Sequence, residues 1–140
     1  IEGFVKTSGK TGLHILLPLG AHYTFDQTRQ FAELLARNVS EQLPDTTSIT
    51  RNPQKREKKV YIDFLQNRHG QTITAPYSLR PVPGACVSTP LRWRELTPHL
   101  HPTQFTIKNI FNRLKRHGDL WKPLLHHKGI DMRKSLDRLA

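Results

Sequence analysis

The chain has 140 residues, which suits one domain with a hydrophobic core, and we expect a single domain over residues 1–140. Its 22 lysines and arginines against 11 aspartates and glutamates give a formal charge of +11 at pH 7, which favours nucleic acid or another polyanion as a partner. A lone Cys86 excludes an internal disulfide, and no apolar run approaches the roughly 20 residues of a membrane span, so we expect a cytoplasmic protein without a membrane partner.

The first predicted element is a strand over residues 13–19, an apolar run that stops at Gly20. It follows a glycine-containing turn over residues 8–12, which brings His14 to the beginning of the strand. Because the run is short and continuous, we expect the strand to be buried in a sheet.

A helix is predicted after Thr24. This threonine and Gln27 form a capping-box pattern, and apolar residues from Phe31 onward recur at helical spacing until Leu43 and Pro44. We expect the helix to cover one face of the sheet.

A second strand is predicted over residues 60–65, which are rich in β-branched and aromatic side chains. Asp63 lies among the apolar residues of this strand. We expect a hairpin partner at residues 72–75. In the proline-rich stretch that follows, only short strand pieces are predicted, near residues 77–79 and 86–88.

Two helices are predicted in the C-terminal part, over residues 107–116 and 132–139, and Gly118 ends the first of them. The inward-facing residues of that helix are expected to be Ile107, Ile110, Phe111 and Leu114. Strands first and helices last indicate an α+β fold built on an open sheet.

The turn before His14 is the first candidate site. Its glycines permit a tight turn whose backbone N–H groups can face an anion. The Ser8 hydroxyl, the ammonium groups of Lys6 and Lys10, and the His14 ring can donate hydrogen bonds to phosphate oxygens. The spacing is not that of a Walker loop. A plain glycine turn between two strands, with the histidine merely packed, explains the same residues.

Asp63 is the second candidate, because an ionised carboxylate among apolar residues is costly unless a metal ion or another cation compensates it. The chain contains no Asp-x-Asp pair that would complete a two-metal site. Asp63 pointing outward from an edge strand explains the same pattern equally well.

Basic residues on either side of that strand form the third candidate, a surface for nucleic acid. We predict that its contacts come from Lys55, Arg56, Lys58, Lys59 and Arg68. A solvated charged loop explains the same run equally well. Arg80 is different, because proline and aromatic neighbours restrict its direction.

Several segments together resemble the polymerase domains of ligase D proteins, which are members of the archaeo-eukaryotic primase superfamily. They are residues 5–9 (VKTSG), 12–14 (GLH), 60–68 (VYIDFLQNR), 75–78 (APYS) and 87–91 (VSTPL). The likeness extends to Trp93, Glu95, Leu96, residues 105–107, Gly118 and Asp119. It implies a primase-like, mostly antiparallel sheet flanked by helices, and the chain would form the C-terminal part of a polymerase fold.

The resemblance also implies roles for single residues. Ser8 and His14 match the motif that holds the incoming nucleoside triphosphate, and Arg80 matches an arginine that contacts its phosphates. Asp63 matches a catalytic, metal-binding aspartate, with Mg²⁺ or Mn²⁺ as the ion. The implied reaction is attack of a primer 3′-hydroxyl on the α-phosphate, in repair of DNA double-strand breaks by end joining. The implied partners are DNA ends or a primer-template, an N-terminal half, a ligase domain and Ku protein.

The chain departs from the family pattern at a few positions. Many members have lysine where Thr11 stands, proline where Cys86 stands and a second arginine where Val82 stands. The family also supplies two aspartates from an Asp-x-Asp segment upstream of Ser8. We therefore expect these 140 residues alone to be inactive and to need an N-terminal half.

Two alternatives stay open beside the polymerase. One is a non-catalytic module that binds nucleic acid or nucleotide through the same basic surface. The other is a histidine-metal hydrolase built from His99, His101, His126 and His127, although their spacing lacks a helical i, i+4 pair with a nearby glutamate. The polymerase hypothesis requires the Ser8 to His14 turn and Asp63 to converge on one cleft.

Overall fold

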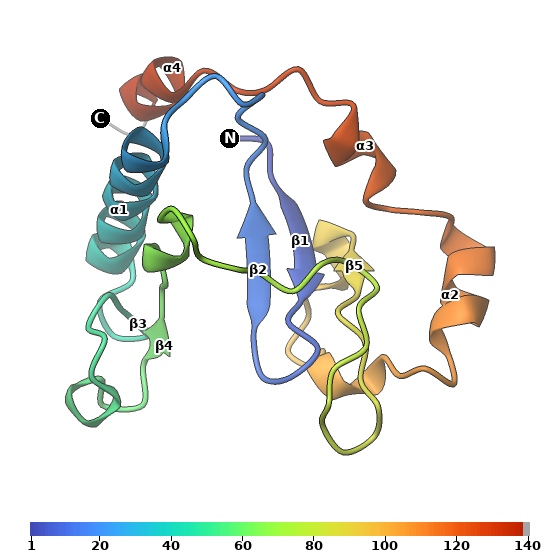
Figure 1. Ribbon diagram of the computed structural model, residues 1–140. Helices are drawn as coiled ribbons and strands as arrows, with labels where there is room; N and C mark the ends of the chain where they lie inside the picture. Colours follow the sequence, from blue (N-terminus) through green and yellow to red (C-terminus); the bar gives the residue numbers. More distant parts are fainter. Residues whose placement is uncertain (139–140) are drawn as a thin grey trace. The chain divides into compact units, whose positions relative to one another are not determined.

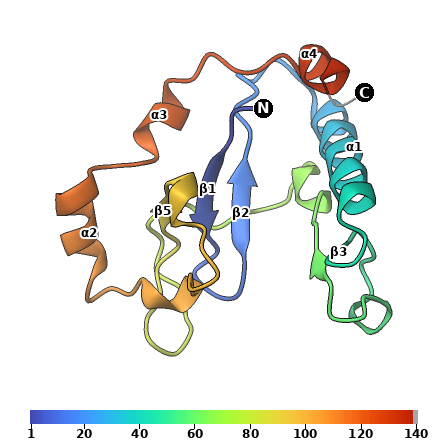
Figure 2. The ribbon, with the colours of Figure 1, turned by 180° about the vertical axis from the view of Figure 1, so that it is seen from behind.

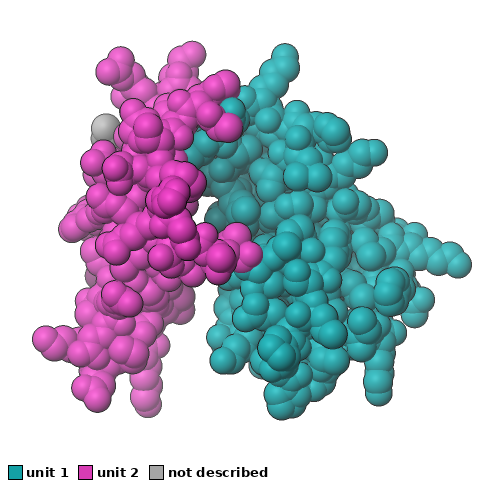
Figure 3. Space-filling model, viewed as in Figure 1, with its two compact units in different colours: residues 1–20, 74–130 teal, residues 21–73, 131–140 magenta. Residues whose placement is uncertain are grey.

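The computed structural model describes residues 1–138, which divide into two compact units (Figure 3). Unit 1 comprises residues 1–20 and 74–130, and unit 2 comprises residues 21–73 together with the C-terminal segment that begins at residue 131. Each unit is described separately below, and the expectation of a single domain stays a prediction.

Unit 1 contains a three-stranded antiparallel sheet in the order β2-β1-β5. Its strands are β1 (Phe4–Thr7), β2 (Leu13–Leu16) and β5 (Pro90–Leu91), and β1 and β2 lie side by side as a hairpin (Figure 1). The predicted strand over residues 13–19 is confirmed at its beginning but ends at Leu16, and the prediction that it is buried is wrong, because Leu13 and Ile15 are 41% and 59% exposed. Pro18, two residues after Leu16, has no N–H to donate to a ladder, and its carbonyl accepts the Ile130 amide at 2.8 Å.

The hydrophobic core of unit 1 lies against this sheet. Val5 of β1, Leu91 of β5 and Phe105 are buried together, and Leu96 and Leu100 pack against them. The Arg113 guanidinium lies over the Phe105 ring, 5.0 Å from its centre, and its fork binds Glu95 at 2.7 and 2.9 Å. The ion pair between Arg113 and Glu95 thus packs against the core at Phe105.

The proline-rich stretch has little regular structure, as predicted. Its short strand pieces are confirmed as two isolated bridges, which join Leu79 to Val87 and Cys86 to Thr106. Two 3₁₀ turns follow, η3 (Trp93–Glu95) and η4 (Pro102–Gln104).

Helix α2 (Ile110–His117) begins three residues later than predicted. The helix begins later because the Asn109 side-chain oxygen accepts the Thr106 amide at 2.9 Å and stabilises the preceding turn. Gly118, with φ of 68°, ends the helix as predicted. The prediction that Ile107 and Phe111 face inward is wrong, because these side chains are 42% and 67% exposed. The short helix α3 (Lys122–Leu125), also visible from behind in Figure 2, was not predicted.

Unit 2 is built around α1 (Phe25–Gln42), and its capping box is confirmed. The Gln27 amide donates to Thr24 Oγ at 3.2 Å, and the Thr24 amide donates to the Gln27 side chain at 2.9 Å. Phe31 and Ala36 form the buried face of the helix, which contacts the 3₁₀ turn η2 (Leu65–Asn67).

The second sheet, also in unit 2, pairs β3 (Thr47–Ser48) in parallel with β4 (Val60–Tyr61). The predicted strand over residues 60–65 is therefore wrong beyond Tyr61. Residues 72–75 form no hairpin partner in the part of the chain that the structure describes. Helix α4 (Met132–Asp137) confirms the last predicted helix, with Asp131 capping the Lys134 amide at 3.1 Å, and Leu139 lies outside the described residues.

No helix within residues 1–138 combines the length and apolarity needed to span a bilayer. The predicted α+β class is confirmed, since the structure has a small antiparallel sheet accompanied by helices.

The hydrogen bond between Tyr77 and Asp119 ties the proline-rich stretch to the segment after α2. Tyr77 Oη donates to Asp119 Oδ1 at 2.7 Å, and this bond is the largest cause that lowers the pKa of Asp119. We expect Tyr77→Phe to reduce the free energy of unfolding by about 1–2 kcal/mol at neutral pH. Urea denaturation of both proteins measures the difference.

The ionised Asp119 should also make this difference depend on pH. Because its folded pKa lies below the ordinary value of 3.8, its contribution is present above that value and is lost as pH falls through the folded pKa. Asp119→Asn provides the control, since it keeps the shape but cannot titrate. A difference between the wild-type and Tyr77→Phe proteins that persists unchanged down to about pH 2 would contradict the assignment.

Candidate functional site

The turn between β1 and β2 leaves the Ser8 hydroxyl proton available to a ligand. Ser8 Oγ accepts the backbone amides of Lys10 at 3.1 Å and of Gly12 at 3.0 Å, and the Ser8 amide donates to the Gly12 carbonyl at 2.8 Å. Both lone pairs of the hydroxyl are thereby used, so its O–H can only donate outward. The turn is closed by the chain itself and presents a donor.

Lys6 and His14 meet because the hairpin register places them directly opposite each other. Lys6 Nζ lies 2.9 Å from His14 Nδ1 and donates to Ser88 Oγ at 2.7 Å, and the Lys6 residue is only 1% exposed. Burial, followed by the nearby Arg80 charge, lowers the pKa of Lys6 to about 8. Burial, then Lys6 and Arg80, also lowers the pKa of His14.

Arg80 completes this group from the proline-rich stretch. Its backbone amide donates to the Cys86 carbonyl at 2.8 Å, and its guanidinium donates to Thr74 Oγ. The Arg80 Nε is buried and has no hydrogen-bond partner among residues 1–138. Its aliphatic stem packs over Gly9, where an added Cβ would lie 2.6 Å from Arg80 Cγ. The Arg80 stem therefore lies beside the Ser8 turn, and the Arg80 charge is near enough to lower the pKa of both Lys6 and His14.

We call Lys6, Ser8, His14 and Arg80 the cationic cluster. In the described part of the chain, neither Lys6 nor Arg80 forms an ion pair with a carboxylate. Neighbouring positive charges without an acidic partner, combined with hydroxyl and ring donors, provide the chemistry of an anion site. Lys10 is exposed at the same turn.

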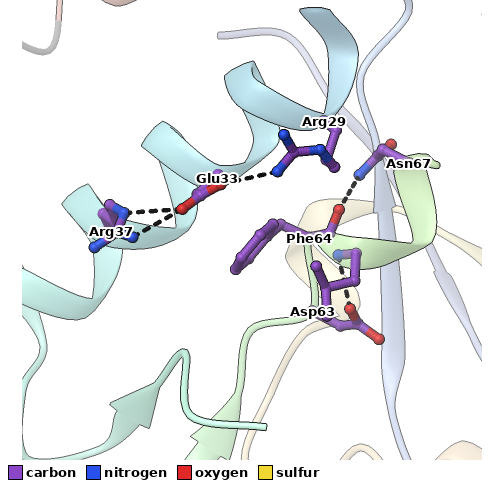
Figure 4. Close-up of polar contacts among 7 residues, drawn as sticks. Arg29, Glu33, Arg37, Asp63, Phe64 and Asn67 are labelled. Carbon is purple, nitrogen blue, oxygen red and sulfur yellow. Dashed lines mark hydrogen bonds and ion pairs between the residues drawn. The ribbon is translucent and has the colours of Figure 1, made fainter. Parts of the chain in front are cut away.

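Asp63 belongs to unit 2 and lies just after β4, not inside an apolar strand as predicted (Figure 4). It is exposed, and its Oδ1 accepts the Leu65 amide at 2.9 Å, which starts the turn η2. It lines a pocket of about 270 Å³ with Arg51, Tyr61, Leu65, Gln66, Arg68 and Gln71. On α1 of the same unit, Arg29 and Arg37 bind Glu33 (Figure 4).

A complete metal centre does not form within residues 1–138. No three His, Cys, Asp or Glu side chains of this part of the chain gather into a set that could hold an ion. Asp63 offers one carboxylate only, and the histidine-metal hydrolase built from His99, His101, His126 and His127 finds no support.

The predicted nucleic-acid residues all belong to unit 2, four before β4 and Arg68 after η2, but they differ in exposure. Lys55 and Lys58 are exposed, whereas Arg56 lies over the Tyr61 ring, 4.7 Å from its centre. Lys59 Nζ is 3.7 Å from Glu57 Oε2. Arg68 is exposed and lines the Asp63 pocket.

Comparison with known proteins assigns the family. The model of the LigD primase-polymerase domain matches residues 1–121. The chain belongs to the LigD primase-polymerase family. The resemblance found in the sequence is thus confirmed.

Relatives in this family are named as bifunctional or multifunctional end-joining proteins. The chain is 35% identical over 119 residues to the bifunctional non-homologous end joining protein LigD of Bacillus subtilis, which covers 84% of this chain and 20% of that protein. It is 31% identical over 114 residues to the multifunctional LigD of Pseudomonas aeruginosa, covering 81% and 14%. The chain therefore spans a fifth or less of these LigD proteins.

A solved LigD structure supports the fold. The polymerase domain of Mycobacterium tuberculosis ligase D, solved in complex with DNA, superposes with a TM-score of 0.81 at 32% identity and covers 87% of this chain and 42% of that chain. The LigD polymerase fold is thereby shown for most of the chain.

Sequence reasoning missed Ser88, which holds Lys6 from the β5 side of the sheet. Ser88 is fully buried, and its hydroxyl donates to the Thr7 carbonyl at 2.7 Å. The only signal in the sequence was a run of hydroxyl residues, Ser88 and Thr89, directly before a strand that begins with proline.

Proposed function

We propose that this chain provides the triphosphate-binding part of a nucleotidyltransferase that extends DNA ends during double-strand-break repair by end joining. The observation that carries the proposal is the cationic cluster, which gathers four donor side chains from two distant segments with no carboxylate partner among the described residues. The end-joining names of the relatives and the DNA complex of the solved neighbour support the same function.

The residues of the cluster would act by holding negative charge. The Ser8 hydroxyl, the His14 ring and the Arg80 guanidinium donate to phosphate oxygens, and Lys6 adds a positive charge behind them. Donors fixed before the ligand arrives need no reorganisation during reaction, which makes them effective at stabilising developing charge on a leaving pyrophosphate.

Asp63 would be one ligand of Mg²⁺ or Mn²⁺. Such an ion activates a hydroxyl nucleophile and neutralises phosphate charge when it is bound. Because Asp63 is the only carboxylate that lines its pocket in the described part of the chain, these residues provide an incomplete metal site and no catalytic step is assigned to it. Convergence of Asp63 with the cationic cluster, and the choice between a polymerase and a non-catalytic binding module, stay predictions.

Binding of inorganic tripolyphosphate to the 140-residue chain tests the proposal directly. We expect binding at neutral pH that weakens by roughly tenfold as pH rises to about 9.5. The bound anion raises the pKa of Lys6 above its free value of about 8. Affinity is therefore greatest below pH 8 and falls until pH reaches the higher pKa of the complex.

Isothermal titration calorimetry in buffers of different ionisation enthalpy should show proton uptake on binding near pH 8. The Lys6→Met protein corrects for ionisation of tripolyphosphate itself. If the wild-type chain does not bind tripolyphosphate at neutral pH, the proposed function is rejected.

Residues 55–59, the basic segment of unit 2, should contribute to DNA affinity through phosphate contacts. We expect replacement of Lys55 and Lys58 by alanine to lower the slope of log affinity against log salt concentration by about 2. Fluorescence anisotropy with a labelled primer-template over a range of salt concentrations measures this slope. Lys108 and Lys128, in unit 1, provide a control pair with the same change of charge. An equal change in both pairs would show that the segment has no special role.

A further inference from the structure

We propose that Lys6 is a positioning residue that fixes the proton of the His14 imidazole on Nε2 and holds the ring so that this N–H faces the triphosphate. The inference rests on the proposed function, and it gives the buried lysine a role other than direct contact with the nucleotide.

The hydrogen bond between the two side chains sets the tautomer. A lysine ammonium has three donors and no acceptor, so His14 Nδ1, at 2.9 Å from Lys6 Nζ, must accept. A ring that accepts at Nδ1 carries its single proton on Nε2 when it is neutral. Burial and the charges of Lys6 and Arg80 lower the pKa of His14, which keeps the ring neutral at physiological pH.

Lys6 is itself held from its other side. Ser88 Oγ accepts from Lys6 Nζ at 2.7 Å, and the same hydroxyl donates its proton to the Thr7 carbonyl at 2.7 Å. Because the Ser88 proton is committed to the Thr7 carbonyl, this hydroxyl can only accept from Lys6. The ammonium is held between Ser88 and His14, and its hydrogen bond to Nδ1 fixes the orientation of the imidazole ring.

Burial distinguishes a positioning role from direct binding. Lys6 is 1% exposed, whereas Ser8 and His14 are both partly exposed. Burying an ammonium is unfavourable when, as among residues 1–138, no carboxylate pairs with it, and an apolar residue at this strand position would pack at lower cost. A donor needed by His14 explains why a charge lies there.

The tautomer is measured by ¹H–¹⁵N NMR on protein labelled at histidine, with the His14 signals assigned through a His14→Gln variant. The wild-type ring should be protonated at Nε2 and unprotonated at Nδ1 at neutral pH. Lys6→Met should allow both tautomers and raise the pKa of His14, while Lys6→Arg restores the wild-type pattern. Lys108→Met, which removes one exposed lysine of the same unit, controls for charge. A wild-type ring protonated at Nδ1 would overturn the proposal without any variant.

A double-mutant cycle then tests whether Lys6 acts through His14. Lys6→Met should weaken tripolyphosphate binding about tenfold in the wild-type background and about twofold or less in the His14→Gln background. Equal effects in both backgrounds would show that Lys6 contributes its charge independently, and the positioning role would be rejected. If the wild-type chain binds no tripolyphosphate, the proposed function fails, whereas the tautomer measurement still decides the link between Lys6 and His14.

Discussion

Replacing Arg80 with alanine is expected to weaken binding of tripolyphosphate by about 100-fold, equivalent to about 2.7 kcal/mol. The Arg80 stem lies beside the Ser8 turn, and its buried Nε has no hydrogen-bond partner among residues 1–138. A charged group with an unused donor contributes strongly to the binding free energy of an anion. The alanine variant also loses the long-range electrostatic attraction of the guanidinium for the anion. Calorimetric titration of both proteins at the same pH and salt concentration gives the ratio of affinities.

Two further variants make this result specific. Arg80→Lys keeps the charge but loses the planar fork, so it should recover only part of the affinity. Arg116→Ala removes an exposed arginine of α2 in the same unit and should leave affinity within about twofold. Arg80 would be excluded from the site if its alanine variant bound as tightly as the Arg116 variant.

Gly9→Ala is expected to destabilise the protein by about 2–4 kcal/mol. Gly9 has φ of 73°, a conformation that an L side chain adopts only with strain. An added Cβ would also lie 2.6 Å from Arg80 Cγ and 2.9 Å from the Ser88 amide nitrogen. The flexible arginine can move, but the Ser88 backbone is held by its own hydrogen bond to the Ser78 carbonyl at 2.9 Å. Urea denaturation of the variant measures the loss.

Gly12 provides a matched control within the same turn. A Cβ added there would meet no atom within 4 Å, and its φ lies outside the left-handed region. Gly12→Ala should therefore change the free energy of unfolding by less than about 1 kcal/mol. A similar loss of unfolding free energy at both glycines would mean that any side chain destabilises this turn. The close approach of Arg80 and Ser88 to Gly9 would then not be the cause.

Local signals in the sequence determined much of the secondary structure. The Thr24 capping box fixed the beginning of α1, and Gly118 fixed the end of α2, because caps are satisfied by residues three or four positions away. The turn at residues 8–12 likewise indicated the donors Ser8 and His14. Predictions failed where position depended on partners: β4 ends at Tyr61 because the strand it pairs with, β3, has two residues, so Asp63 falls in the following loop.

The family, the helices α1, α2 and α4, and the chemical identity of the candidate phosphate-binding residues could thus be inferred from the sequence, whereas the short helix α3 could not. Other features depend on contacts between distant segments: Lys6 is buried, its ammonium binds Ser88, 82 residues further along the chain, and Arg80 packs on Gly9. Caps and turns are encoded in a few neighbouring residues, whereas such contacts arise when β1 pairs with β5 and brings distant segments together. The environment that sets the pKa of Lys6 and the proton position of His14 therefore exists only in the folded chain.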